Sequence, residues 1–444
     1  MINYDVVKYF TKEQLWTLCV QLFENRSPDF VLALNMYVSE SCDPRAIALF
    51  GAWEQRNDRH YLSEIIFQQG VERFPDNPEM WFGLATSIKD PGRWEESEAM
   101  FLKGLELEPS STAGLANLSS LYNEVCMYDK ALEYAQKSLD VERTIPALDG
   151  IAMASYGLED YAKGGDYNTF SLGEKYRREV IYGDEPRWDG SKDKRIIIYG
   201  EQGIGDEIFY GSAIPDAIRD SKEVIIDCDY RLESLFKRSF PEASVYGTRD
   251  KSCDWMGNHE WDARCAMAGL WQFYRRKRED FGGLPYLKPC PVRLKQWLNL
   301  WKTRSGDNIG VVWDGGALFT NRKYRSFPQE ILERLDGNLV NLSWETKETR
   351  INVENYPWAT ITNDYDNTAA LVASLDYVVT CCQSIVHLCG GLGVPCYVLR
   401  PKYYTWRYAN GMPMYQSVTV IECDGDWEKG IDEVIELRKK EKAA

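Results

Sequence analysis

The stretch Arg195-Ile196-Ile197-Ile198-Tyr199-Gly200-Glu201-Gln202-Gly203-Ile204-Gly205-Asp206 decides the fold of the second half of the chain. Its first five residues form an almost uninterrupted apolar run, which is typical of a strand buried on both faces of a parallel sheet. Glycines follow this strand, and a helical pattern then runs through 208–218. A buried strand, a glycine-rich turn and a helix in this order predict a Rossmann-like α/β unit.

The same alternation of strand and helix continues towards the C-terminus. Apolar runs predict further strands at 224–227, 308–313, 339–342, 377–380 and 396–399, with helical patterns at 329–335, 368–374 and 384–392. Alternating strands and helices indicate parallel sheets with helices on both faces. The two series, linked through 285–306, predict two Rossmann-like domains at 191–300 and 301–444. We expect the ligand between them, at the carboxyl ends of the strands.

The first half repeats itself every 34 residues. Residues of similar kind recur at this offset: Phe50, Leu84 and Leu118; Ser63, Ser97 and Ala131; Phe67 and Phe101; Gly70 and Gly104; Pro75 and Pro109. Large residues at helical spacing, small residues between them and a terminating proline describe a helical hairpin, and the pattern resembles the tetratricopeptide repeat. We expect three repeats at 46–143, a helical cap at 1–45, and a second cap with a linker at 144–190.

Charge is unevenly distributed along the 444 residues, whose net charge is −16. Residues 1–190 carry 18 basic and 32 acidic side chains, whereas residues 191–444 carry 34 and 36. The acidic repeats either dock a partner or an acceptor polymer, or act as a spacer that sets the geometry of a homo-oligomer.

The sequence also indicates the environment of the chain. It contains no apolar stretch of membrane-spanning length, and its start lacks the pattern of a signal peptide. Its 12 cysteines do not form a disulfide-type pattern. We therefore expect a cytoplasmic protein with reduced thiols and no membrane span.

The first of three candidate loops is Gly203-Ile204-Gly205-Asp206. Its glycines let the backbone approach a ligand closely, and the helix that follows offers free N–H groups to an anion. Asp206 would face the cleft, where a carboxylate can take a proton from an acceptor hydroxyl. Alternatively, the loop is a tight turn in which Asp206 caps the helix.

The second candidate loop is Asn321-Arg322-Lys323-Tyr324-Arg325-Ser326-Phe327-Pro328. Its cations can neutralise phosphates, and Ser326 is placed to cap a helix after Pro328. The alternative is a solvated basic loop.

The third candidate loop begins with Cys382-Gln383-Ser384 and opens a glycine-containing helix after a buried strand. A pyrophosphate can meet amide donors at such a helix start. His387 lies one turn into this helix, where simple packing is the alternative to a functional role.

These loops belong to an ordered set of short motifs. Besides 201–207, the set contains Pro285-Tyr286-Leu287, Gly310-Val311-Val312-Trp313, Arg325-Ser326-Phe327-Pro328, Thr368-Ala369-Ala370-Leu371, 387–395 and Trp406-Arg407-Tyr408. Their order resembles that of tetratricopeptide-linked glycosyltransferases related to the bacterial heptosyltransferases of glycosyltransferase family 9. The resemblance implies a GT-B fold, made of two Rossmann-like domains that face each other across a cleft. It also implies a nucleotide-sugar donor held mainly by the C-terminal domain, and inverting transfer without a metal or other cofactor.

The resemblance also implies roles for individual residues. Asp206 matches the general base of the family, Arg325 matches a basic residue that faces the donor phosphates, and His387 lies in the phosphate- and ribose-binding loop. Asp206 and His387 are therefore the candidate catalytic residues. The candidate donor- or phosphate-binding residues are Gly203, Gly205, Arg325, Ser326, Gln383 and Ser384. Further candidate contacts to donor or acceptor are Glu201, Gln202, Trp313, Glu345, Trp406 and Arg407.

One departure from the family pattern concerns the donor site. The family usually has Asp-Thr or Asp-Ser four to five residues before the histidine, where this chain has Cys382 and Gln383. A carboxylate is thus missing, which leaves the sugar and the nucleotide open. The alternative function is a non-catalytic tetratricopeptide scaffold with a degenerate nucleotide-binding module.

Two metal interpretations compete with this assignment. Asp227-Cys228-Asp229 has the Asp-x-Asp form that metal-dependent GT-A glycosyltransferases use to hold a cation and a donor diphosphate. A cluster of sulfur and imidazole ligands would suggest zinc, although its spacing lacks paired Cys-x-x-Cys knuckles: Cys381, Cys382, His387, Cys389 and Cys396. We favour metal-independent transfer, because two strand–helix series argue against GT-A.

The segment 264–325 is a candidate for binding the acceptor. It carries 13 Lys/Arg against 4 Asp/Glu, with aromatic residues interleaved. Such a face suits a polyanion such as DNA, as in glycosylation of modified phage DNA bases. The alternative is a solvated helix face beside a cleft that is basic for its donor. A glycan, a protein and a DNA base all stay open as acceptors.

Overall fold

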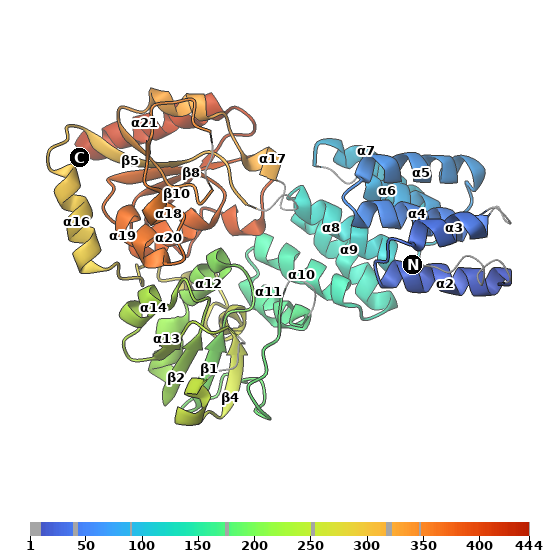
Figure 1. Cartoon of the computed structure of the whole chain (residues 1–444), viewed down its shortest axis with the longest axis horizontal. Helices are drawn as coiled ribbons and strands as arrows, with labels where there is room; N and C mark the ends of the chain where they lie inside the picture. Colours follow the sequence, from blue (N-terminus) through green and yellow to red (C-terminus); the bar gives the residue numbers. More distant parts are fainter. Residues whose placement is uncertain are drawn as a thin grey trace. The chain divides into compact units, whose positions relative to one another are not determined.

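The computed structural model describes residues 10–38, 43–88, 91–173, 177–249, 254–316, 322–345 and 348–443. The chain forms two compact units, Met1–Gly150 and Ile151–Ala444. The first is helical, and the second contains two parallel sheets with helices on them (Figure 1). No helix within the described residues is long and apolar enough to cross a membrane.

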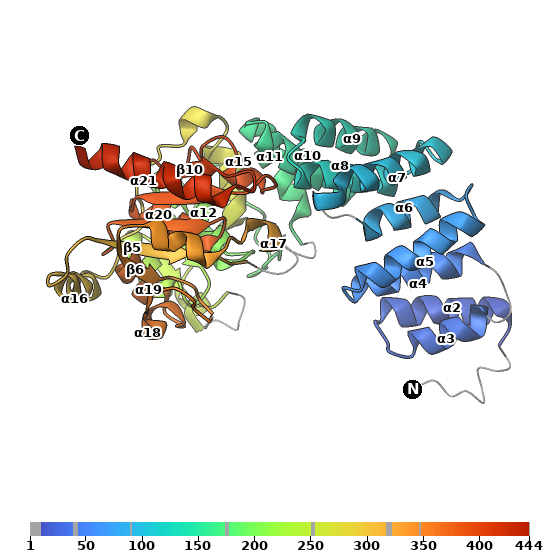
Figure 2. The same cartoon turned by 90° about the horizontal axis from the view of Figure 1, so that it is seen from above.

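The first unit is an array of helical pairs. Figure 2 shows its helices following one another as hairpins. Their bounds are α2 (Lys12–Glu24), α3 (Phe30–Val38), α4 (Pro44–Arg56), α5 (His60–Arg73), α6 (Pro78–Ser87), α7 (Trp94–Leu107), α8 (Thr112–Glu124) and α9 (Tyr128–Val141). The first helices of three successive pairs begin at 44, 78 and 112, and the second helices at 60, 94 and 128. These starts confirm the period of 34 residues, so the unit contains three tetratricopeptide-like repeats.

The residues that defined the repeat also hold the helices together. Phe67 is 3% exposed, and its ring fills the space beside Gly51 and Gly83, where an added Cβ would lie 2.2 Å and 2.0 Å from the ring. The Ser97 hydroxyl donates to the Ala85 carbonyl at 2.8 Å, across the two helices of one hairpin. Large residues therefore pack where small residues let the helices approach closely.

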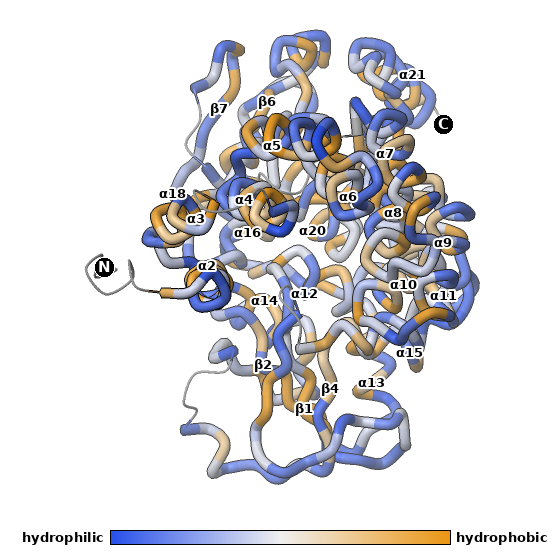
Figure 3. Tube along the Cα trace, turned by 90° about the vertical axis from the view of Figure 1, so that its right-hand side faces the viewer, coloured by the Kyte–Doolittle hydropathy of each residue, from blue (hydrophilic) through white to orange (hydrophobic). Residues whose placement is uncertain are grey.

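The first sheet has the strand order β3-β2-β1-β4, and all its pairings are parallel. Its strands are β1 (Arg195–Tyr199), β2 (Glu223–Asp227), β3 (Ser244–Tyr246) and β4 (Ala263–Ala266). Figure 3 shows the hydrophobic colour concentrated along β1 and β2. The helices of this half are α12 (Ile204–Gly211), α13 (Ile214–Asp220), α14 (Glu233–Ser239) and α15 (Leu270–Tyr274). The single helix expected at 208–218 is two helices, because Pro215 near the start of α13 lacks the N–H that a continuous helix needs.

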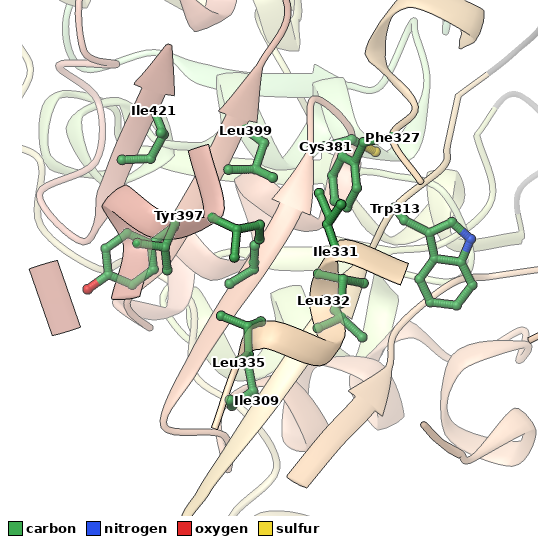
Figure 4. Close-up of a cluster of buried hydrophobic side chains, with 14 of the residues drawn as sticks. Ile309, Trp313, Phe327, Ile331, Leu332, Leu335, Cys381, Tyr397, Leu399 and Ile421 are labelled. Carbon is green, nitrogen blue, oxygen red and sulfur yellow. The ribbon is translucent and has the colours of Figure 1, made fainter. Parts of the chain in front are cut away.

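The second sheet has the order β10-β9-β8-β5-β6-β7, again with parallel pairings. Its strands are β5 (Asp307–Val312), β6 (Gly337–Asn341), β7 (Glu354–Asn355), β8 (Tyr377–Cys381), β9 (Cys396–Arg400) and β10 (Val418–Glu422). Its helices are α16 (Pro291–Trp301), α17 (Arg322–Arg325), α18 (Pro357–Thr360), α19 (Tyr365–Val372), α20 (Ser384–Leu392) and α21 (Trp427–Ala443). The helix expected at 329–335 is the 3-10 helix η7 (Gln329–Arg334), whose Leu332 belongs to the same buried hydrophobic cluster as Leu399 and Ile421 (Figure 4).

Residues 151–173 belong to the second unit and pack closely on it. They include the end of α10 (Ile145–Gly157) and all of α11 (Tyr161–Asn168). The Tyr156 ring stacks on Trp406 with centroids 4.2 Å apart, and Asp166 pairs with Arg276. The structure thus divides the chain after Gly150, inside the segment that we assigned to a cap and linker at 144–190. The other proposed boundaries stay predictions.

The ten cysteines among the described residues carry free thiols, and eight of them are buried. That these thiols are reduced in the cell stays a prediction from the sequence.

Candidate functional site

Two helix starts meet where the sequence predicted phosphate-binding loops. Helix α12 begins directly after β1, and α20 begins directly after β8. A Cβ added at Gly205 would lie 2.9 Å from Ser384 Cβ and 3.7 Å from His387 Cδ2, so only glycine permits this approach. Gln383, at the N-cap position of α20, makes no side-chain cap hydrogen bond to the helix, and its Nε2 donates to Thr380 Oγ1 at 3.3 Å. The first N–H groups of α20 are therefore left to favour an anion.

A cavity of about 480 Å³ opens beside these helix starts. Its described lining combines polar groups with apolar ones: Gly203, Ile204, Arg231, Leu342, Trp344, Thr360, Ile361, Thr362, Asn363, Tyr365, Thr368, Gln383, Ser384 and Ile385. The Trp344 side chain is 57% exposed at this cavity. Its volume and mixed lining are typical of small-molecule sites. Of the predicted residues, Gly203, Gln383 and Ser384 are in this lining, whereas Asp206, Arg325 and His387 are not among the lining residues that the structure describes.

Asp206 combines the two alternatives that the sequence left open. Its Oδ2 accepts a hydrogen bond from the Gly203 N–H at 3.2 Å, which caps α12. Its Oδ1 lies 2.6 Å from Nη2 of Arg407, in the loop that follows β9. The side chain is about one quarter exposed, so a substrate can reach it. Asp206 is therefore both a helix cap and an accessible, ion-paired carboxylate.

Arg407 is surrounded by aromatic rings. Its guanidinium carbon lies 5.4 Å from the Trp406 ring centroid, 5.5 Å from that of Phe209 and 5.9 Å from that of Tyr210. Burial alone would lower the pKa of Arg407, but the charge of Asp206 outweighs it and raises the pKa above its ordinary value. The guanidinium is thus firmly positive beside the candidate base.

His387 is 4% exposed and surrounded by rings. Its ring centroid lies 4.8 Å from that of Phe209, and its Nδ1 lies 3.4 Å from the Tyr415 hydroxyl. Burial, and secondarily the charge of Arg407, lower the pKa of His387 to about 3. The imidazole is therefore neutral near pH 7. The burial and ring contacts of His387 favour the packing alternative that the sequence left open, and its candidate catalytic role stays a prediction.

The basic loop is organised by Asp314, which sequence reasoning missed. Its two carboxylate oxygens accept from Arg322 at 2.7 Å and 2.6 Å, and Oδ1 also accepts from the Ser326 hydroxyl at 2.7 Å. Ser326 therefore does not cap the following helix, as we had expected, because its hydroxyl is held by Asp314 and Pro328 occupies the cap position of η7. Arg322 also reaches Glu345 at 3.3 Å. An acidic residue two positions after the end of β5 was the available signal for Asp314.

Arg325 reaches the start of α20. Its Nη1 donates to the Cys382 carbonyl at 3.1 Å, and the backbone of Gly316, at φ +86°, leaves room for the guanidinium. Trp313 is 6% exposed and belongs to the core of the second sheet, so packing explains it. Asn321, the first residue of the predicted loop, lies outside the described residues.

Glu201 and Gln202 lie at the end of β1, next to a second cavity of about 340 Å³. Glu201 is buried and pairs with Arg177 at 3.2 Å. Gln202 donates from Nε2 to Glu201 Oε1 at 3.1 Å. The second cavity is lined by Arg178, Gly200, Glu201, Asp229, Tyr230, Gly247, Thr248 and Arg249. Of the two predicted residues, Glu201 lines it.

Both carboxylates of the Asp-x-Asp motif bind other residues of the protein. Asp227 accepts from the N–H of Thr248 at 3.0 Å and from the Tyr182 hydroxyl at 2.7 Å. Asp229 pairs with Arg231 at 2.8 Å and with Arg249 at 3.1 Å. Within the described residues, no three potential ligands come together around a metal position. The geometry therefore gives no support to the two metal interpretations.

Six of the 13 basic residues in the segment 264–325 pair with carboxylates elsewhere in the second unit. Its arginines pair with carboxylates from other segments: Arg264 with Glu179, Arg275 with Asp216, Arg276 with Asp166, Arg278 with Glu159, Arg293 with Asp364 and Arg304 with Glu354. Charges that are already paired attract phosphates less strongly. The structure thus favours the structural interpretation of this segment over a docking face for a polyanion.

Comparisons with known proteins add a distant relative and several helical proteins. No protein-family model matches the chain. Protein FlbA of Caulobacter vibrioides is 26% identical over 276 residues, which cover 54% of this chain and 46% of FlbA. The chain therefore spans about half the length of this curated relative.

Two solved structures illustrate the structural similarities. A tetratricopeptide-repeat protein of Thermus thermophilus, TTC0263, is 15% identical with a TM-score of 0.34, covering 37% of this chain and 91% of its own. PilF of Pseudomonas aeruginosa is 16% identical with a TM-score of 0.32, covering 36% and 74%.

Proposed function

We propose that the second unit is an inverting, metal-independent glycosyltransferase of the GT-B type. It would transfer a sugar from a nucleotide-sugar donor to a hydroxyl group of an acceptor. The observation that supports this proposal best is the cavity of about 480 Å³ between the two sheets, beside the starts of α12 and α20. A ligand with one apolar ring and one anionic group suits a cavity with both kinds of lining.

The donor would bind along this cavity. Trp344, Leu342 and Ile361 offer apolar surfaces to a nucleobase. The N–H groups at the start of α20 would take the phosphates, with Arg325 close by at the Cys382 carbonyl. This placement points the sugar towards Gly205 and Asp206, because Gly205 borders Ser384.

In the transfer itself, Asp206 would accept the proton of the acceptor hydroxyl. The hydroxyl oxygen forms a bond to the anomeric carbon of the sugar from the face opposite the nucleotide. The bond from that carbon to the phosphate oxygen breaks, and the nucleotide leaves with both electrons. Arg325 and the α20 amides would stabilise the negative charge on the leaving group.

The departure at Cys382 and Gln383 changes the chemistry of the donor site without closing it. Cys382 is 2% exposed and contributes its carbonyl to Arg325. Gln383 lines the cavity with a neutral amide where the family has an acidic or hydroxyl side chain. An amide both donates and accepts, so it can still bind ribose or sugar hydroxyls.

A non-catalytic scaffold is the second candidate function. The observation that favours it is the engagement of both Asp206 carboxylate oxygens, by the Gly203 N–H and by Arg407. In that case the repeats would dock a protein partner, and the second unit would bind a nucleotide without turnover.

One experiment separates the two candidates. The full chain is screened by thermal shift against UDP-, GDP-, ADP- and CMP-sugars, and each stabilising donor is then tested for nucleotide release. For the enzyme we expect stabilisation and turnover, with turnover abolished in Asp206→Asn while nucleotide binding is retained. Binding without release favours the scaffold. Stabilisation by none of these donors contradicts the glycosyltransferase.

A further inference from the structure

The candidate base Asp206 forms an ion pair with Arg407. Oδ1 of Asp206 lies 2.6 Å from Arg407 Nη2, and Oδ2 accepts from the Gly203 N–H at 3.2 Å. A carboxylate takes a proton through a lone pair, and each of these oxygens already has a donor. The shorter contact joins two full charges and is the stronger of the two. Each carboxylate oxygen has a second lone pair, so an acceptor hydroxyl would share Oδ1 with the guanidinium, whose positive charge draws on the same oxygen.

Arg407 is not fully satisfied by this pair. Among the described parts of the chain, its buried Nε has no hydrogen-bond acceptor. Aromatic rings of Trp406, Phe209 and Tyr210 surround the guanidinium, and the ring faces attract its positive charge. A buried donor without an acceptor carries a free-energy cost that an incoming ligand oxygen would remove.

The pair also lies next to the place proposed for the donor. Gly205 directly precedes Asp206, and a Cβ added there would lie 3.2 Å from Ser384 Cα, at the start of α20. The Arg407 charge reaches the same helix, because it contributes to the lowered pKa of His387. Asp206 lies in the first turn of α12, which follows β1 in one sheet, and Arg407 follows β9 in the other sheet. A donor bound between the sheets would contact both Asp206 and Arg407.

We infer that Arg407 exchanges partners during the reaction. It pairs with Asp206 in the donor-free protein, turns to the anionic part of the donor when the donor binds, and so releases the Asp206 carboxylate for the acceptor hydroxyl. This inference rests on the proposed glycosyltransferase function and adds an order of events, with donor binding before acceptor activation. Arg407 is then both a donor contact and a positioning residue for Asp206.

Nucleotide affinity tests the exchange. UDP, GDP, ADP and CMP are titrated calorimetrically into the full chain as wild type, Asp206→Asn, Arg407→Ala and the double variant. In the wild type, binding must first break the ion pair. Asp206→Asn removes that competition and is expected to bind the preferred nucleotide about tenfold more tightly, the size of one charge-assisted hydrogen bond. Arg407→Ala is expected to bind about tenfold more weakly, and the double variant to match Arg407→Ala.

Two controls accompany these variants. Arg276→Ala removes another arginine–aspartate pair of the same unit, with Asp166, and should leave nucleotide affinity unchanged. Arg407→Lys keeps the charge and replaces Arg407→Ala if the latter does not fold, as judged by its melting temperature. With Arg407→Lys, partial retention of the affinity is expected.

The outcomes distinguish a failure of the partner exchange from a failure of the proposed function. If a nucleotide binds the wild type and binds Asp206→Asn equally well, the pair is a static link and the exchange is wrong, while the proposed function stands. If no nucleotide binds the wild type, the proposed function is wrong and the exchange falls with it. Tighter binding by Asp206→Asn that disappears in the double variant supports the exchange.

Discussion

Gly205→Ala tests directly whether the starts of α12 and α20 touch. The added methyl carbon would lie 2.9 Å from Ser384 Cβ and 3.2 Å from Ser384 Cα. Carbon atoms at rest lie about 3.5–4.0 Å apart, so one helix start must move by several tenths of an ångström. Such overpacking costs about 1–3 kcal/mol. The gain of helix propensity from glycine to alanine offsets about 1 kcal/mol of this. We therefore expect a net loss of up to about 2 kcal/mol.

The assay is urea unfolding followed by tryptophan fluorescence, together with nucleotide titration of the folded variant. Gly282→Ala is the matched control, because an added Cβ there meets no described atom within 4 Å. Gly205→Ala should lower the unfolding midpoint relative to Gly282→Ala and weaken nucleotide binding by about tenfold, since the helix starts would bind the phosphates. A Gly205→Ala protein with the stability and affinity of the control would refute the contact between the helix starts.

Three further predictions concern the repeats, the histidine and the link between the sheets. In urea unfolding, Phe67→Ala should destabilise the repeat unit by about 3–5 kcal/mol, because Phe67 is buried against Gly51 and Gly83. Tyr61→Ala is the control and should change the stability little, because the Tyr61 side chain is 74% exposed. In the folded protein the pKa of His387 is about 3, whereas an unfolded histidine has a pKa near 6.5. Between these two pH values the unfolded chain binds more protons than the folded protein. The free energy of unfolding therefore falls as the pH drops. From pH 7 to pH 5 the wild type should lose about 2 kcal/mol more than His387→Phe, and equal losses would argue against a neutral buried imidazole. Arg238→Ala should lower the free energy of unfolding by about 3 kcal/mol, because it removes two hydrogen bonds, at 2.7 Å and 2.8 Å, from the buried Asp366 carboxylate. Arg276→Ala removes an exposed ion pair and should lower it by less than about 1 kcal/mol in the same assay.

Periodic patterns allowed most of the fold to be predicted from the sequence. The 34-residue repeat located the hairpins because each repeat uses the same large and small residues. Apolar runs located β1, β5 and β8 because these strands are central in their sheets and buried on both faces. The edge strands β3, β4, β7 and β10 were missed, and three of them have only two to four residues. Such short strands carry too little pattern to be recognised.

The site was only partly predictable. Gly203, Gln383 and Ser384 follow central strands, and a residue at that place lies at the edge where ligands bind. Arg231 and Trp344 line the same cavity, but they come from the segments after β2 and β6, where the local sequence gives no such signal. The pairing of Asp206 with Arg407 joins the start of α12, after β1, to the segment after β9 in the other sheet. Only the packing of the two sheets in three dimensions reveals this pair.

The most direct test of the central claim is nucleotide release from a nucleotide-sugar by the full chain. UDP-, GDP-, ADP- and CMP-sugars are incubated separately with the wild type and with Asp206→Asn, and the free nucleotide is quantified by chromatography. The account predicts that one donor releases its nucleotide with the wild type, and that Asp206→Asn binds the same nucleotide without releasing it from the sugar. Release from none of the four, or equal release by the two proteins, would contradict it.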